Sequence, residues 1–192
     1  HRFDLKFLVR AITASKTYQL TSAATHESQN EPQAFARMML KGLTPEQVFD
    51  SLVTATGYRE ARPGEAVPPG FLDPGTARAE FLSKFANSSD KRTEHQTSIL
   101  QALSLMNGKF VADATGLQSS GTLGALLDVP FMDNRGRLDA LYLAALSRPM
   151  RPQEAARLVP YVDKGGPSGD SRKALADVYW ALLNSSEFIL NH

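Results

Sequence analysis

Apolar residues recur every three or four positions through most of the chain, which is the spacing of one face of an α-helix. The segment 4–15 shows it first, with Leu5, Leu8, Val9 and Ile12 in one stripe that we expect to face a core. Alternating strand patterns are nearly absent. The sequence therefore predicts an all-α fold, an irregular bundle of about seven to eight helices joined by long Pro/Gly-rich loops.

Residues that start and stop helices set the expected boundaries. The clearest start is Thr44, followed by Pro45 and by Gln47 for a capping box, and Gly57 suits a left-handed helix end. Trp180 is expected to be buried against the helix 138–146. The predicted helices cover residues 4–15, 35–40, 44–56, 76–85, 93–107, 138–147, 152–162 and 171–183.

The chain organisation expected from these patterns is a single helical domain over residues 1–192. We expect this domain to be the C-terminal fragment of a longer polypeptide, because the chain begins at His1 and leads at once into an amphipathic pattern. The segment 58–75 is dense in Pro and Gly and predicts a long loop, and the segment 115–134 predicts an irregular, glycine-rich stretch. No apolar run approaches the roughly 18 to 20 residues of a membrane span.

Composition excludes several classes of site. The chain has 0 cysteines, which removes disulfides, thiolate metal sites and covalent c-type haem. Lys and Arg number 21 against 20 Asp and Glu, so there is no basic excess of the kind that nucleic acid binding requires. The four histidines (His1, His26, His95 and His192) are far apart in the sequence and form no metal-ligand spacing. We therefore expect no metal, no cofactor and no nucleic acid partner.

Five segments follow one another in the order of a known family. Phe7–Leu20 resembles the motif L-V-R-x-I-x-x-S-x-T-Y-Q-x-S, and Leu43–Leu52 is similar to R-L-x-A-E-x-I-x-D-A. The other segments are Leu100–Gly108 (L-Q-A-L-x-L-x-N), Leu141–Pro149 (L-Y-L-x-x-L-x-R-x-P) and Ala174–Phe188 (D-L-x-W-A-L-L-N-S-x-E-F). Together they resemble the planctomycete PSD domain, the domain-of-unknown-function family numbered 1553.

The resemblance implies an extracytoplasmic protein, periplasmic or secreted, that often carries a cytochrome-c-like module, and it brings no established reaction. The expected partners are other domains of the parent polypeptide or an exported protein. Two features depart from the family pattern. Residues 33–41 hold only Arg37 and Lys41 where relatives have R-R-x-x-R-R-L, and the loop 58–75 is shorter than in many relatives.

The candidate binding residues lie at helix ends. Ser15, Tyr18 and Gln19 belong to a hydroxyl-rich helix exit, which can either line a cleft or satisfy the last carbonyls of the helix, with Tyr18 buried. Arg37 is the central cation of its segment. Asn107 and Arg148 can stabilise the ends of their helices or converge on a polar site. No catalytic residue is predicted.

Three hypotheses about function remain open on the sequence. The first is a scaffold or interaction domain, because capping and core patterns dominate and no catalytic set converges. The second is a hydrolase or polysaccharide-handling domain with a site near 15–22 and 58–75. The third is a docking module for a haem-carrying domain of the same polypeptide. Whether the chain is an enzyme is left undecided.

Overall fold

A computed structural model describes residues 3–20, 22–31, 33, 36–38, 40–58, 76–86, 109–117 and 120–191. The chain divides into two compact units, where the sequence favours a single helical domain. The first comprises His1–Lys41 with Leu190–His192, and the second comprises Gly42–Ile189. Each unit is described by itself below.

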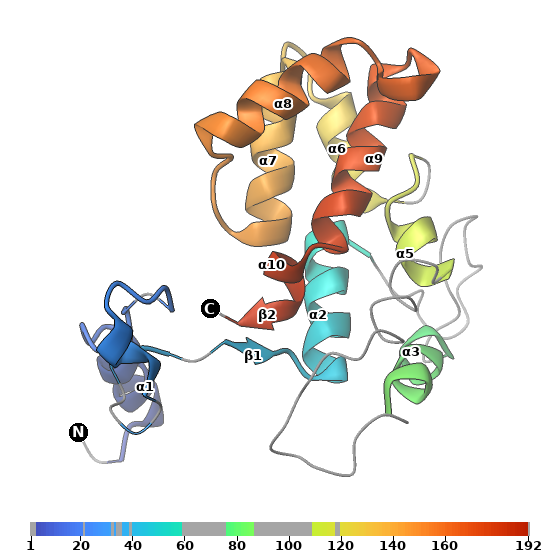
Figure 1. Cartoon of the computed structure of the whole chain (residues 1–192). Helices are drawn as coiled ribbons and strands as arrows, with labels where there is room; N and C mark the ends of the chain where they lie inside the picture. Colours follow the sequence, from blue (N-terminus) through green and yellow to red (C-terminus); the bar gives the residue numbers. More distant parts are fainter. Residues whose placement is uncertain are drawn as a thin grey trace. The chain divides into compact units, whose positions relative to one another are not determined.

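The all-α prediction is confirmed (Figure 1). The α-helices within the described residues are α1 (Leu5–Thr13), α2 (Pro45–Thr56), α3 (Thr76–Ala86), α5 (Lys109–Ala114), α6 (Gly121–Asp128), α7 (Asn134–Leu146), α8 (Pro152–Asp163), α9 (Ser171–Leu183) and α10 (Ser186–Ile189). The same described residues also form the 3-10 helices η1 (Glu27–Asn30) and η3 (Gly166–Ser168) and the short paired strands β1 (Lys41–Gly42) and β2 (Leu190–Asn191).

Four segments differ from the sequence-based expectation or cannot be compared with it. The helix expected at 35–40 is not formed at the described residues 36–38 and 40. The expected helix 93–107 and most of the expected loop 58–75 lie outside the described residues. The segment 115–134, expected to be irregular, holds the eight-residue helix α6, whose first turn is capped by the side chain of Ser120.

The core of the second unit lies where α2, α6, α7, α8 and α9 meet (Figure 1). Its fully buried side chains include Leu52 of α2, Leu123 of α6, Leu141 of α7 and Leu175 of α9. Full burial of a leucine contributes about 1.5–3 kcal/mol. This core holds the helices of the second unit together.

Helix α2 begins and ends as the sequence predicts. The Thr44 hydroxyl accepts a hydrogen bond from the amide of Gln47, and the Gln47 side chain accepts one from the amide of Thr44. Gly57 ends the helix at φ 64°, in the left-handed region. A side chain at Gly57 would press against Thr122, so this glycine also permits close approach of α6.

An aromatic cluster extends the core toward α3 and α5. The ring of Phe49 lies 5.4 Å from that of Phe81 and 5.1 Å from that of Phe110. Tyr58 packs edge-on against Phe110, and the Arg78 guanidinium lies 5.2 Å from the centre of the Phe49 ring. Such ring pairs add about 0.5–1.5 kcal/mol each beyond their buried area.

The most deeply buried aromatic residue of α9 is Tyr179, the neighbour of Trp180. Trp180 is partly buried and packs against the core, whereas Tyr179 is completely buried. This burial agrees with the expectation for Trp180, and its contact with the helix 138–146 stays a prediction. The bounds expected for α9, residues 171–183, are confirmed.

The first unit differs from the second in the exposure of its apolar residues. Helix α1 is capped by the Asp4 carboxylate, which accepts hydrogen bonds from the amides of Lys6 and Phe7. No described residue of this unit is buried. The expectation that the stripe of α1 faces a core is therefore wrong within the described residues, because Leu5, Leu8, Val9 and Ile12 are all exposed.

Candidate functional site

The candidate residue that the structure places best is Arg148, in the turn between α7 and α8. Helix α7 ends at Leu146 and is capped by Ser147, which adopts φ 55° and donates its amide hydrogen to the carbonyl of Leu143. Pro149 follows, and a proline disfavours helical backbone at the residue before it. The sequence thus forces a sharp turn that presents Arg148 toward α8 and α10.

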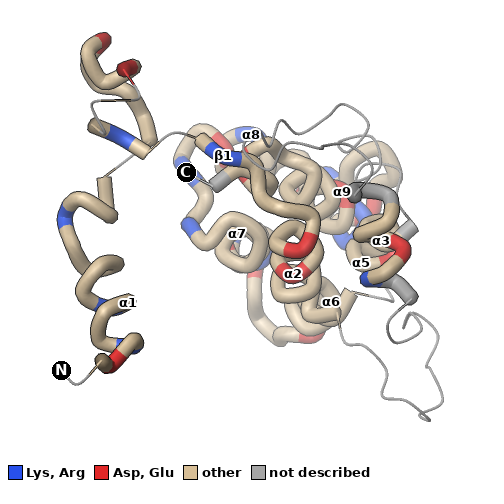
Figure 2. Tube along the Cα trace, turned by 90° about the horizontal axis from the view of Figure 1, so that it is seen from below, with Lys and Arg blue, Asp and Glu red and all other residues tan. Residues whose placement is uncertain are grey.

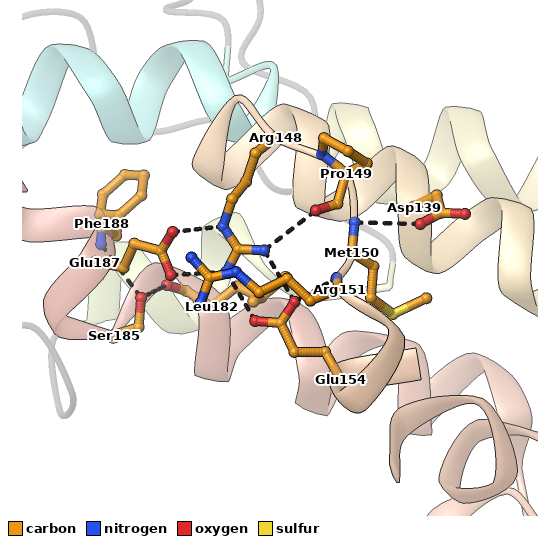
Figure 3. A network of polar contacts seen from close by, with 10 residues as sticks. All are labelled: Asp139, Arg148, Pro149, Met150, Arg151, Glu154, Leu182, Ser185, Glu187 and Phe188. Carbon is orange, nitrogen blue, oxygen red and sulfur yellow. Dashed lines mark hydrogen bonds and ion pairs between the residues drawn. The ribbon is translucent and has the colours of Figure 1, made fainter. Parts of the chain in front are cut away.

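Arg148 bridges two glutamates from different elements (Figure 3). Its guanidinium donates to both carboxylate oxygens of Glu154 on α8, at 2.9 and 2.7 Å. It also donates to both oxygens of Glu187 on α10, at 2.5 and 2.8 Å. The guanidinium lies 5.3 Å from the ring centre of Tyr142. Two bidentate ion pairs of this kind fix both distance and orientation.

The electrostatics of this cluster follow from its contacts. Hydrogen bonds from Arg148 hold the pKa of Glu154 down at about 2, against an ordinary value of 4.5. Hydrogen bonds to Glu187 and Glu154 raise the pKa of the Arg148 guanidinium above its ordinary value. Burial raises the pKa of Tyr142. At neutral pH the cluster therefore holds one cation between two anions.

Further hydrogen bonds make the cluster part of the framework. The Glu154 carboxylate also accepts from the amide of Arg151, and the Asp139 carboxylate accepts from the amide of Met150 (Figure 3). Both interactions satisfy amides at the start of α8 or just before it. A carboxylate held charged by an arginine and a backbone amide is unsuited to general acid catalysis near pH 7. The chemistry available to Arg148 is that of a clamp between α7, α8 and α10.

A cavity of about 460 Å³ opens beside this turn, between α2, the end of α7 and α10. One face of α2 supplies polar residues at helical spacing, namely Gln47, Asp50, Ser51 and Thr54. Small residues of α7 line the opposite side, and Leu43, Ala55 and Phe188 complete the wall. None of the candidates drawn from the sequence pointed to this cavity; the run of polar residues at i, i+3, i+4 and i+7 on α2 is the signal that could have indicated it.

At the end of α1 in the first unit, the side chains of Ser15 and Gln19 donate hydrogen bonds to backbone carbonyls. The Ser15 hydroxyl donates to the carbonyl of Ile12 at 2.7 Å, and the Gln19 amide donates to that of Thr13 at 3.2 Å. The side chain of Tyr18 is 62% exposed, contrary to the interpretation that buries it. These groups complete the end of α1 and its following turn.

Arg37 lies in the same unit and holds a loop together. Its guanidinium donates to the carbonyls of Gln29 and Ser22, at 3.1 and 2.9 Å, and to the side chain of Asn30. These bonds close the segment 22–30 onto Arg37. A guanidinium with three such acceptors is a structural tie.

One further candidate, Asn107, lies outside the described residues. The Asn184 side chain donates to the carbonyl of Trp180 at 2.8 Å, which caps its own helix.

Among the described residues no three His, Cys, Asp or Glu side chains are grouped as metal ligands. No helix in the described ranges is long and apolar enough to cross a membrane.

One family model matches part of the chain. Residues 1–80 match the family model PSD1, a protein of unknown function (DUF1553). This match confirms the resemblance to the planctomycete PSD domain, carried within those residues by Phe7–Leu20 and Leu43–Leu52. The three other resembling segments lie beyond residue 80. No curated protein and no solved structure matches the chain.

Proposed function

We propose that this chain, whose residues 1–80 match the DUF1553 family model, is a helical interaction module of an exported multidomain protein. The docking face is the apolar stripe of α1. Its partner is another domain of the parent polypeptide or a separate exported protein. The module itself carries out no reaction.

The observation that supports this proposal is the exposure of the stripe. Leu5, Leu8, Val9 and Ile12 are 72, 51, 58 and 49% exposed. Four large apolar side chains on one face of a helix mark a surface that another molecule or domain covers. Each contributes about 1 kcal/mol or more once it is covered.

A neighbouring face of α1 gives the stripe a defined edge. Lys6 and Arg10 lie four residues apart on that face, and Lys and Arg appear as blue segments on the α1 tube in Figure 2. A partner therefore meets an apolar surface bordered by cations. Lys6 and Arg10 remain in water when the stripe is covered.

A second observation favours a module without catalysis. The polar candidates that the sequence suggests make structural contacts: Ser15 and Gln19 complete a helix end, Arg37 ties a loop and Arg148 clamps a turn. These four candidate groups are thus already used by the framework.

Cysteine labelling tests the proposal, because the chain contains 0 cysteines and any introduced thiol is unique. Leu8→Cys places a thiol in the stripe, and Lys6→Cys places a matched control on the basic face. Both are labelled with a maleimide in this chain alone and in a natural polypeptide that carries it with further domains.

We expect Leu8→Cys to react about tenfold or more slowly in the larger polypeptide, while Lys6→Cys reacts at the same rate in both. For a separate exported partner the same slowing is expected in an extracytoplasmic extract. Equal rates for Leu8→Cys in all three settings contradict the proposal.

A further inference from the structure

The charged residue that lines the cavity between α2, α7 and α10 is acidic. Its charged lining residue is Asp50, and no Lys, Arg or His lines it among the described residues. Asp50 pairs through Oδ1 with Arg78, and its second oxygen, Oδ2, lies outside that ion pair. Both side chains of the pair are more than a third exposed, so the carboxylate remains open to a second cation.

The carboxyl end of α7 adds to this character. Ala144, Ala145 and Ser147 line the cavity at the last turn of the helix. Within the described residues no backbone hydrogen bond outside the helix ends on the carbonyls of Ala144 or Ala145. Carbonyls at the end of a helix carry the negative pole of its dipole, which attracts cations.

The cation that follows the end of α7 in the chain is already paired. Arg148 follows Ser147 directly, but its guanidinium is shared between Glu154 and Glu187. Glu187 precedes the lining residue Phe188. Because its two carboxylate partners neutralise it, Arg148 does not oppose a positive group in the cavity.

The rest of the wall combines apolar residues with three hydroxyls and the Gln47 side chain. Leu43, Ala55 and Phe188 offer contact to an aliphatic chain, while Ser51, Thr54 and Ser147 offer hydroxyl oxygens as hydrogen-bond acceptors. A volume of about 460 Å³ is in the range of small-molecule sites. The cavity combines an apolar wall with an electronegative rim.

We propose that this cavity binds a primary ammonium group carried on a short aliphatic arm, as in a lysine side chain or a free alkylamine. The arm lies along Leu43, Ala55 and Phe188. The ammonium donates to Asp50 and to the carbonyls at the end of α7. This inference is independent of the docking face on α1.

The test is an amide NMR titration of the whole chain with n-butylammonium, with 1-butanol as the neutral control of the same length. Nα-acetyl-lysine methylamide is the third probe and represents a lysine of a polypeptide. Asp50→Asn removes the carboxylate from the rim, and Asp128→Asn is the matched control, since Asp128 is exposed on α6 and lines no part of the cavity.

The expected result is saturable shifts confined to residues 43–55, 144–147 and 188 with the two ammonium probes, and weaker shifts with the alcohol. Asp50→Asn is expected to weaken ammonium binding about two- to fivefold, and Asp128→Asn to leave it unchanged. Stronger shifts with the lysine derivative than with n-butylammonium identify a polypeptide as the source of the group.

Three results overturn the proposal: equal binding of butanol and butylammonium, shifts spread over all acidic residues, or no saturable shift with any probe. The comparison of the three probes on the wild-type chain is decisive by itself, so the proposal remains testable even where a variant fails to fold.

Discussion

The hydroxyl of Tyr179 donates a hydrogen bond of 2.6 Å to the carbonyl oxygen of Ala55, 124 residues away in the chain. The hydroxyl of Thr122 donates to the same oxygen at 2.7 Å. Ala55 lies in the last turn of α2, where carbonyls have no partner within the helix. One buried acceptor thus joins α2, α6 and α9.

Removing this hydroxyl is the first prediction. Burial raises the pKa of Tyr179, so the hydroxyl stays protonated and remains a donor across the accessible pH range. Tyr179→Phe is expected to lower the free energy of unfolding by about 1 kcal/mol, measured by urea denaturation. Tyr161→Phe removes a hydroxyl that bonds to Asp177 at the surface and should change it by less than about 0.5 kcal/mol. Equal effects would show that the carbonyl of Ala55 does not anchor the three helices.

The clamp at Arg148 gives the second prediction. Arg148→Met retains an apolar stem over Tyr142 and leaves Glu154 and Glu187 without their shared cation. We expect the free energy of unfolding to fall by about 2 kcal/mol at pH 7. Arg151→Met is the control, since the exposed Arg151 contributes its backbone amide to this network. A loss of the same size in both variants would argue against a specific clamp.

The third prediction is the pH dependence of that loss. The pKa of Glu154 is about 2 in the folded chain and 4.5 ordinarily, so its pairing stabilises the fold fully above about pH 5. The stabilisation disappears as the pH falls toward 2, because the unfolded chain takes up the proton first. The difference in unfolding free energy between wild type and Arg148→Met should therefore narrow from pH 5 to pH 2. A difference that stays constant over this interval contradicts the ion pair as its source.

The helices that sequence predicts well are those whose ends are defined by local chemistry. Thr44 and Gln47 specify the start of α2, and Gly57 specifies its end, through contacts within a few residues. The same holds for α9, where Asp170 caps the first turn. Caps can be identified from sequence because both partners of each hydrogen bond are near one another in the chain.

Burial is harder to predict, because it depends on distant partners. Trp180 and Tyr179 are adjacent, and the position of α9 against α2 decides that the tyrosine faces inward. The apolar periodicity correctly predicts that α1 is a helix with one apolar face. Periodicity indicates that such a face has a partner, but it does not identify that partner. Arg148 is a candidate by its position after α7, whereas its partner Glu187 lies 39 residues away.

The fourth prediction compares two leucines of α7. Leu141 is fully buried, and Leu143, two residues on, is 53% exposed. Leu141→Ala should lower the free energy of unfolding by about 2–5 kcal/mol, since it leaves a cavity in the core. Leu143→Ala should change it by less than about 0.5 kcal/mol. Thermal and urea unfolding of both variants would check the orientation of α7, and a larger loss at Leu143 would contradict it.

The turn between α8 and α9 supplies the last prediction, through two glycines that both have positive φ. Gly165 adopts φ 77° and Gly169 adopts φ 67°. A Cβ at Gly165 would collide with the backbone of Gly169 and Asp170, which cannot move away because the amide of Asp170 donates to the carbonyl of Gly165 at 2.9 Å. A Cβ at Gly169 meets nothing within 4 Å among the described residues.

The two alanine variants separate conformational strain from steric clash. Gly169→Ala incurs only the cost of left-handed backbone, about 1–2 kcal/mol. Gly165→Ala incurs that cost and the displacement of the turn, so its loss in unfolding free energy should exceed that of Gly169→Ala by about 1–3 kcal/mol. Because the turn sets the angle at which α9 leaves α8, the larger loss should come with shifted amide resonances in the first turn of α9. Equal losses at the two positions would mean that the close approach of residues 165 and 170 does not hold in solution.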